Sequence, residues 1–172
     1  MPGGTSVAAA GGSGTAEGAT ALAVSSTAFS PGGAIPRSFT CDGEGVSPDL
    51  SWSEAPAGVQ SFAVIAEDPD APRGTFTHWL VWNIPGQSKG LEKNVPNDET
   101  LANGARQGRN GFGRTGYAGP CPPAGTAHRY FFKVFALDAK LDLKAGAGRD
   151  ELESAMKGHV MTQGEVMGAY GR

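Results

Sequence analysis

The sequence has few basic residues and no long apolar run, and each shortage removes a class of protein. Its 172 residues include 14 Lys and Arg against 17 Asp and Glu, which gives a formal net charge of −3. A nucleic-acid-binding surface needs a basic patch, and none is present. No apolar stretch approaches the roughly 20 residues that span a bilayer. Lys and Arg are absent before Arg37, whereas signal and transit peptides contain basic residues, so we expect a cytoplasmic protein.

The sequence also has few cysteines and no histidine spacing that is typical of a metal site. The two cysteines, Cys41 and Cys121, are too few for a disulfide scaffold, and each lies in a turn rich in Gly and Pro. They pair if those two turns meet in the fold, which the sequence leaves open. The three histidines form neither H-x-H nor H-E-x-x-H, so neither a metal nor another cofactor is expected.

Helical periodicity is lacking until about the last 25 residues. The 27 Gly and 12 Pro predict many turns, and the short apolar runs between them predict strands. We therefore expect one β-dominated sandwich domain over residues 21–172. Residues 1–20, rich in Gly, Ala and Thr, cannot bury enough apolar surface to offset the entropy of ordering, so we expect them to be disordered. The expected elements are an edge strand within 22–29, a central strand over 130–138, a helix over 150–157 and a closing strand within 159–170 with a turn or bulge at Gly164.

The stretch most suggestive of a site is residues 62–85. Two apolar runs in it predict a pair of buried strands. The loop between them, E-D-P-D-A-P, contains two prolines that stiffen the backbone and hold three carboxylates on a rigid turn. His78 follows at the start of the second strand. Because loops on a rigid scaffold often carry function, Asp68 and His78 are candidate site residues, and Asp70 is expected to cap the turn.

A second stretch, residues 120–130, has a similar layout. Its prolines predict a rigid wall, residues 125–127 offer backbone N–H groups that can cradle an anion, and His128 directly precedes an apolar strand. A carboxylate beside an imidazole favours the charged ring, which donates well to an anion. We therefore expect Asp68, His78 and His128 to form a small pocket for a phosphate-like group. Alternatively, Asp68 binds the ammonium of a zwitterion while the histidines bind its phosphate.

Two further patterns are assigned structural roles. Residues 111–116 match G-x-G-x-x-G, but a dinucleotide site needs a strand before this motif and a helix after it. A loop precedes the motif here, and the prolines that follow prevent a helix. His159 lacks the loop-to-strand setting of the other two histidines, so a structural role is expected for it.

Taken together, these motifs resemble the phosphatidylethanolamine-binding protein family over residues 29–172. Segments near the N-terminus, among them S-P-D-L-S-W at 47–52, resemble its bacterial and archaeal branch, often called Raf-kinase-inhibitor-like. The family motifs are D-P-D-A-P at 68–72 followed by His78, G-P-C-P-P at 119–123 and G-T-A-H-R-Y at 125–130. The resemblance implies a β-sandwich of two antiparallel sheets with one or two short helices, and an anion pocket lined by Asp68, His78, Pro122, Pro123, His128 and Tyr130.

The resemblance also implies a function. Members bind phosphate groups and phospholipid head groups, and no enzymatic activity is generally accepted, so we expect a non-enzymatic binding module. Some members inhibit kinases or proteases, so the alternative is an inhibitor that acts through the pocket rim, where Arg114 is the residue to test. A metal-dependent hydrolase is a third alternative, and a homodimer is common in the bacterial branch. One departure is N-G-F-G at 110–113, where that branch commonly has N-D-F-G, so any contact of the aspartate is missing.

Overall fold

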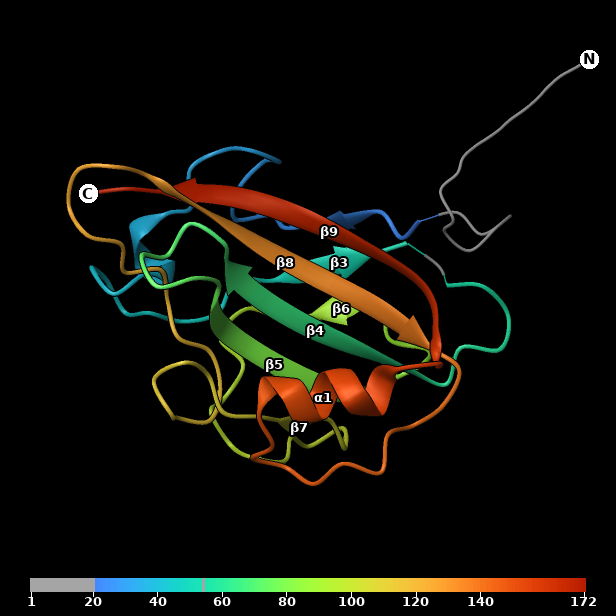
Figure 1. The fold of residues 1–172 in the computed structure, drawn as a ribbon. Helices are drawn as coiled ribbons and strands as arrows, with labels where there is room; N and C mark the ends of the chain where they lie inside the picture. The colour runs from blue at the N-terminus through green and yellow to red at the C-terminus, as the bar shows by residue number, and fades with distance from the viewer. Residues whose placement is uncertain (1–20, 54) are drawn as a thin grey trace, which may run out of the picture.

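Two antiparallel sheets lie face to face in this protein (Figure 1), which confirms the predicted β-sandwich. The structure is a computed structural model that describes residues 21–53 and 55–172. Residues 1–20, predicted to be disordered, lie outside the described residues. The strand order in the smaller sheet is β2 (Val24–Ser25), β3 (Leu50–Trp52), β6 (Gly90–Leu91). The strand order in the larger sheet is β7 (Arg106–Gln107), β5 (Phe76–Pro85), β4 (Ser61–Asp68), β8 (His128–Leu137), β9 (Val160–Tyr170).

The centre of the larger sheet is β4, in which every residue is buried. Successive side chains of a strand point to opposite faces. Phe62 and Val64 therefore belong to the core between the two sheets, whereas Ala63 and Ile65 pack into a second core on the other face, beneath the helix α1 (Arg149–Met156). The strand β8, expected at the centre, lies one place away from it, between β4 and β9.

Two irregularities interrupt the pairing of β5 with β4. Asn83 has a positive φ of 58°, a conformation that Asn tolerates better than most residues, and its side chain makes two hydrogen bonds to the backbone of Leu141, at 2.7 and 3.0 Å. The second irregularity lies at His78. The β4 partners pass directly from Trp79 to Thr77, which leaves His78 as the extra residue of a bulge. Bulges redirect a side chain and often lie beside functional sites.

The helix predicted over residues 150–157 is α1, shifted by one residue. Arg149, at its start, binds the buried carboxylate of Glu67 in β4, and Lys133 in β8 binds the other oxygen at 2.9 Å. Burial alone would raise the pKa of Glu67, but the two cations overcome this and lower it. This network ties the helix to the sheet. Among the described residues, no helix has the length and apolar character that crossing a bilayer requires.

Two strand predictions need correction. Gly164 is neither a turn nor a bulge, because it pairs with Val134 inside the β8–β9 ladder. A Cβ atom there would lie 2.0 Å from the carbonyl oxygen of Leu22, so glycine is needed for the close approach of the N-terminal segment. Of the edge strand predicted within 22–29, only β2 forms. The residues that follow turn away, since Thr27 donates backbone and hydroxyl hydrogen bonds to the side chain of Asp49.

Candidate functional site

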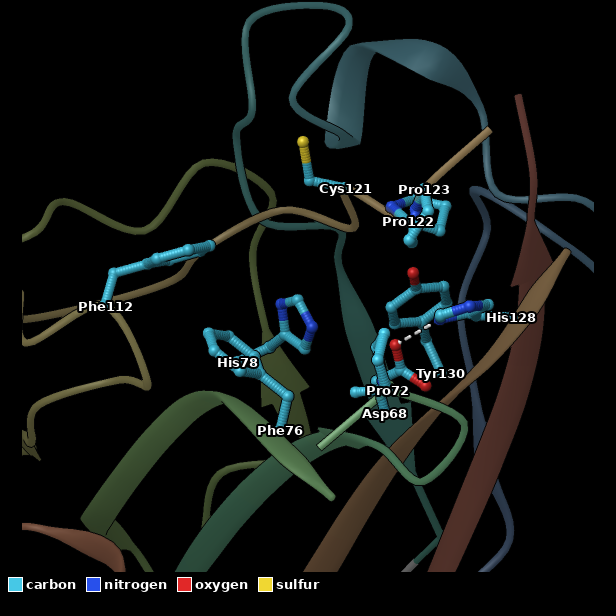
Figure 2. Close-up of a pocket in the computed structure, with 11 residues that line it drawn as sticks. Asp68, Pro72, Phe76, His78, Phe112, Cys121, Pro122, Pro123, His128 and Tyr130 are labelled. Carbon is cyan, nitrogen blue, oxygen red and sulfur yellow. Dashed lines mark hydrogen bonds and ion pairs between the residues drawn. The ribbon is translucent and has the colours of Figure 1, made fainter. Parts of the chain in front are cut away.

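The ends of three strands meet around one pocket. Asp68 ends β4 and His128 begins β8, and these neighbouring strands run antiparallel, so the two residues lie at the same edge of the sheet. The bulge places His78, near the start of β5, at that edge as well. The pocket has a volume of about 250 Å³, smaller than most drug-sized sites (Figure 2). All the residues predicted to line a pocket line this one: Asp68, His78, Pro122, Pro123, His128 and Tyr130.

The carboxylate of Asp68 is fixed from two sides. One oxygen, Oδ2, accepts a hydrogen bond from Nδ1 of His128 at 2.7 Å, and both side chains are buried. The other, Oδ1, accepts from the backbone N–H of Asp70 at 2.8 Å, so Asp68 itself caps the turn. The pair therefore orients the His128 ring, and its Nε2 is left for a ligand.

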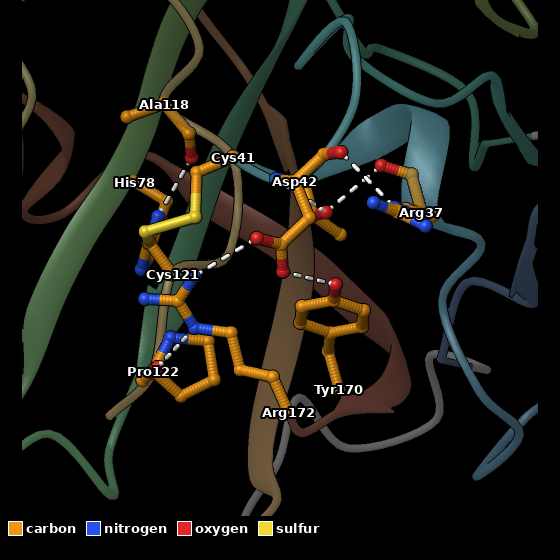
Figure 3. The surroundings of a disulfide bond; sticks show 10 residues. Arg37, Cys41, Asp42, His78, Ala118, Cys121, Pro122, Tyr170 and Arg172 are labelled. Carbon is orange, nitrogen blue, oxygen red and sulfur yellow. Dashed lines mark hydrogen bonds and ion pairs between the residues drawn. A yellow bond between two sulfur atoms is a disulfide. The ribbon is translucent and has the colours of Figure 1, made fainter. Parts of the chain in front are cut away.

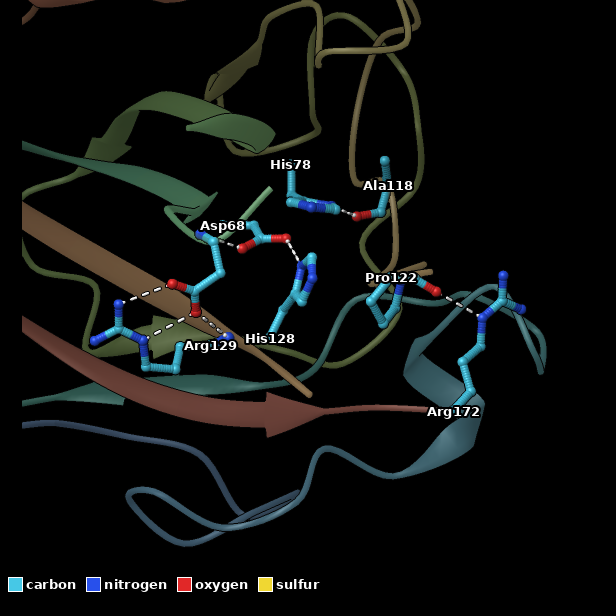
Figure 4. A network of polar contacts seen from close by, with 8 residues as sticks. Asp68, His78, Ala118, Pro122, His128, Arg129 and Arg172 are labelled. Carbon is cyan, nitrogen blue, oxygen red and sulfur yellow. Dashed lines mark hydrogen bonds and ion pairs between the residues drawn. The ribbon is translucent and has the colours of Figure 1, made fainter. Parts of the chain in front are cut away.

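Asp70 does not cap the turn as predicted. Its carboxylate accepts hydrogen bonds from the backbone N–H, Nε and Nη2 of Arg129, at 2.9 to 3.0 Å. Figure 4 shows Arg129 next to His128 and Asp68. These charge-assisted bonds lower the pKa of Asp70 to about 2. The contact fastens the acidic loop after β4 to the start of β8, next to His128. Asp70 thus holds the two halves of the pocket together rather than facing into it.

His78 is anchored in the same way as His128. Its Nδ1 lies 2.6 Å from the carbonyl oxygen of Ala118, and because a carbonyl can only accept, Nδ1 carries the proton. The backbone N–H of Ala118 in turn donates to the carbonyl of His78 at 2.9 Å. Burial lowers the pKa of His78 more than the Ala118 carbonyl and the charge of Asp68 raise it. The resting ring is therefore neutral near pH 7, with Nε2 left for a ligand.

Tyr130 contributes a buried hydroxyl to the pocket. Within the part of the chain that the structure describes, this hydroxyl makes no hydrogen bond of standard geometry, although the carboxylate of Asp68 lies close to it. Burial, followed by the negative charge of Asp68, raises the pKa of Tyr130, so the group stays protonated and can donate. An unpaired buried hydroxyl is costly, and a ligand that accepts a hydrogen bond would remove this cost.

The proline wall of the pocket is fastened by a disulfide (Figure 3). Cys41 and Cys121, whose pairing the sequence left open, are bonded, with their Cα atoms 5.4 Å apart. Beside the bond, the guanidinium of Arg172 donates to the carbonyl of Pro122 and to the carboxylate of Asp42, both at 2.8 Å. The wall therefore holds its position through a covalent link and a charged one.

Three predicted features lie elsewhere. Residues 125–127 do not line the pocket, and the N–H of Gly125 donates to the carbonyl of Arg172 at 2.9 Å. His159 lies 2.8 Å from Asp138 and is nearly half exposed, which fits the structural role expected for it. Arg114 is exposed in the turn that follows Asn110, whose backbone N–H donates to the Arg114 carbonyl.

The sequence also contains a formal match to the nucleophile elbow of hydrolases, G-x-S-x-G, at residues 86–90. That elbow needs a strand before the serine and a helix after it. Here Ser88 lies in the turn between the strands β5 and β6, and its carbonyl accepts a hydrogen bond from the indole of Trp52. No histidine is among the described residues that line the neighbouring cavity, so this match does not indicate a hydrolase.

Sequence reasoning missed two aromatic residues of the pocket, Phe76 and Phe112. Their ring centroids lie 4.8 Å apart, and the ring of Phe76 meets that of His78 at the same separation. Phe76 directly precedes the Thr77–His78 pair, so its nearness to the histidine was the available signal. Phe112 lies in a Gly-rich loop that gave no sign of packing against this edge.

Comparisons with known proteins agree with this architecture. A family model described as phosphatidylethanolamine-binding protein matches residues 25–171. A UPF0098 protein of Methanothermobacter thermautotrophicus is 50% identical over 145 residues, which is 84% of this chain and 95% of that protein. A UPF0098 protein of Aquifex aeolicus is 47% identical over 153 residues, which is 88% of this chain and 89% of that protein.

Two solved structures share the fold. The phosphatidylethanolamine-binding protein homologue CT736 of Chlamydia trachomatis is 38% identical, with a TM-score of 0.81 over 88% of this chain and 98% of that chain. YbcL of E. coli, described as a member of the mammalian family, is 34% identical, with a TM-score of 0.83 over 89% of this chain and 99% of that chain. Family model, relatives and fold agree: the chain belongs to the phosphatidylethanolamine-binding protein family.

Proposed function

We propose that this protein is a non-enzymatic binding module whose pocket takes a phosphate-type head group. The observation that carries the proposal is the matched anchoring of the two histidines. Each ring donates Nδ1–H to a fixed oxygen, of Ala118 for His78 and of Asp68 for His128, and so presents Nε2 for a ligand. With the hydroxyl of Tyr130, the pocket supplies three polar groups suited to the oxygens of one phosphate.

The charges around the pocket determine how an anion binds. Among the described residues that line the pocket there is no Lys or Arg, so positive charge comes from the imidazoles. Because burial keeps His78 neutral at rest, phosphate binding is expected to draw a proton onto its Nε2. Affinity for phosphate should therefore rise as the pH falls from 7.5 to 6.

Among the described residues that line the pocket, no free thiol, amine or aliphatic hydroxyl is present to act as a nucleophile. None of the described residues that line it is Ser, Thr or Lys, and Cys121 is occupied by its disulfide. The raised pKa of Tyr130 makes the phenolate rare near neutral pH. These features favour binding over covalent catalysis by a hydroxyl, thiol or amine group.

The test is calorimetric titration with inorganic phosphate at pH 6.5, in two buffers of different ionisation enthalpy. We expect saturable binding with net proton uptake, and loss of binding in His78→Ala and His128→Ala. The matched control is His159→Ala, which removes the exposed histidine on Asp138, far from the pocket lining. Circular dichroism checks that each variant folds. Phosphate binding that survives both pocket substitutions, or that His159→Ala abolishes equally, would refute the proposal.

A further inference from the structure

The proline wall, which we define as residues 121–124, is a short span between two anchored points. Before it, the carbonyl of Pro120 accepts a hydrogen bond from the N–H of Cys41 at 3.1 Å. After it, the N–H of Gly125 donates to the carbonyl of Arg172 at 2.9 Å. The four residues between these points belong to no strand or helix. Their position therefore depends on links that the wall makes itself.

Few links reach the wall. Pro122 and Pro123 have no N–H group, so neither can donate a backbone hydrogen bond. Over residues 21–53 and 55–172, the covalent and hydrogen-bonding links to the wall are two (Figure 3). One is the disulfide at Cys121, and the other is the hydrogen bond of 2.8 Å from Nε of Arg172 to the carbonyl of Pro122. Packing of the buried Pro122 adds to them.

Both links fasten the wall to the same turn. The disulfide ends at Cys41, and Arg172 donates to the carboxylate of the next residue, Asp42, at 2.8 Å. That carboxylate also accepts a hydrogen bond of 2.5 Å from the hydroxyl of Tyr170, which fixes the turn to the end of β9. Since the two links join the same pair of segments, either one can hold the wall when the other is lost.

The two links respond to different conditions. Cys41 and Cys121 are exposed, so a thiol can reach their bond. The side chains of Arg172 and Asp42 are 41% and 24% exposed, so salt screens their attraction. The covalent link is therefore sensitive to reductants and insensitive to salt, and the ionic link has the opposite sensitivities.

Reduction of the bond is ordinary thiol–disulfide exchange. One thiolate of a dithiol attacks one sulfur, forms a mixed disulfide and releases the other cysteine as a thiolate. The second thiolate of the dithiol then resolves the mixed disulfide. Cys41 and Cys121 gain two electrons and two protons, and the dithiol becomes a disulfide. Because compartments differ in how far they keep thiols reduced, the state of this bond depends on where the chain resides.

We propose that the disulfide is a redox-sensitive latch of the proline wall that works in parallel with Arg172. With the bond formed, the wall stays ordered whether or not Arg172 is engaged. With the bond reduced, its order depends on Arg172 and so on ionic strength. Because Pro122 and Pro123 line the pocket, a disordered wall should weaken phosphate binding. This last step rests on the proposed function, whereas the latch itself does not.

The experiment measures NMR order parameters of the Ala124 and Gly125 amides in four forms of the protein. The bond is either intact or removed by Cys41→Ser with Cys121→Ser, and each form is made with Arg172 and with Arg172→Ala. We expect values of about 0.85, typical of rigid backbone, in three forms, and values below about 0.6 only where both links are missing. Circular dichroism checks that each form folds.

A salt titration tests the same inference without altering the arginine. Raising the salt from about 0.02 to about 0.5 M should lower both order parameters in the double cysteine variant and leave them unchanged in the oxidised protein. The matched control is Arg37→Ala in the double cysteine variant. Arg37 donates to the backbone carbonyl of Asp42 at 3.0 Å and makes no printed contact with the wall, so at low salt this substitution should leave the wall ordered.

Two results would overturn the latch. Loss of order in the double cysteine variant at low salt would show that Arg172 does not hold the wall, and full order with both links missing would show that neither link does. Inorganic phosphate should bind about three- to tenfold more weakly when both links are missing, because binding must then order the wall. An unchanged affinity with a disordered wall would refute the effect on the pocket alone. If the oxidised protein binds no phosphate, the proposed function fails while the order parameters still decide the latch.

Discussion

The disulfide between Cys41 and Cys121 should contribute a large part of the free energy of unfolding of this domain. It joins residues that are 80 positions apart in the sequence. In the chain-entropy treatment, closing a loop of this length restricts the unfolded chain and contributes about 4.5 kcal/mol at 25 °C. Because each kcal/mol shifts the melting temperature of a domain this size by about 2–4 °C, removal of the bond should lower it by roughly 9–18 °C.

The native structure should change little when the bond is removed. Both cysteines are exposed, so Cys41→Ser with Cys121→Ser deletes little packing. The N–H of Cys41 still donates to the carbonyl of Pro120 at 3.1 Å, and Arg172 still links Asp42 to the proline wall. The loss therefore arises mainly in the unfolded chain, which is what the entropic treatment assumes.

Urea unfolding followed by tryptophan fluorescence measures the effect, since all three tryptophans are buried. The double variant and the unaltered protein treated with a dithiol reductant should unfold at the same, lower urea concentration, because the exposed bond is open to reduction. Near-UV circular dichroism without urea should be nearly the same in all samples. A loss below about 1 kcal/mol would contradict the reasoning, because an 80-residue loop cannot give so small an entropic term.

Two further predictions concern buried charge. Since burial lowers the pKa of His78, the unfolded chain takes up a proton there before the folded one, and stability should fall as the pH drops below about 6.5. Urea midpoints measured between pH 7.5 and 5 in phosphate-free buffer should therefore fall less steeply for His78→Gln than for the unaltered protein. Equal slopes would exclude His78 as the cause. Glu67→Gln leaves Lys133 and Arg149 without their shared carboxylate and should cost about 2–3 kcal/mol in urea unfolding, whereas the control Glu153→Gln, at a half-exposed partner of Arg149, should cost under about 0.5 kcal/mol. Similar losses in both would contradict a special role for the buried carboxylate.

Much of the fold could be predicted because its signals are local. The apolar runs within 62–85 correspond to β4 and β5, and the turn-forming glycines Gly146 and Gly158 lie on either side of α1. The bulge at His78 could not be predicted, since it exists only in the pairing of β5 with β4. The prediction at Gly164 was wrong for a similar reason. Glycine within a strand suggests a bulge, but here glycine is needed because the Leu22 carbonyl, over 140 residues away in the sequence, lies too close for a side chain.

The site was predicted as a set of residues rather than as a set of contacts. Two motifs sixty residues apart in sequence gave Asp68 and His128, and the β4–β8 ladder joins them. Asp70 was misassigned because its partner, Arg129, comes from the other motif. The pairing of Cys41 with Cys121 could not be predicted, because local sequence does not say which turns meet in the fold. The cytoplasmic location, the homodimer and an inhibited kinase or protease stay predictions, since contacts within one chain do not bear on them.

The glycine at position 111 shows how sequence and structure differ in what they reveal. In the sequence, Gly111 stands where the bacterial branch commonly has an aspartate, which suggests only that a contact is lost. In the structure, the missing side chain is the space that the ring of Phe76 occupies, 35 positions earlier in the chain. That ring supports the exposed ring of Phe112 at the pocket mouth. A departure from the family pattern thus supplies an apolar surface in place of a carboxylate, which would also remove a negative charge that repels phosphate.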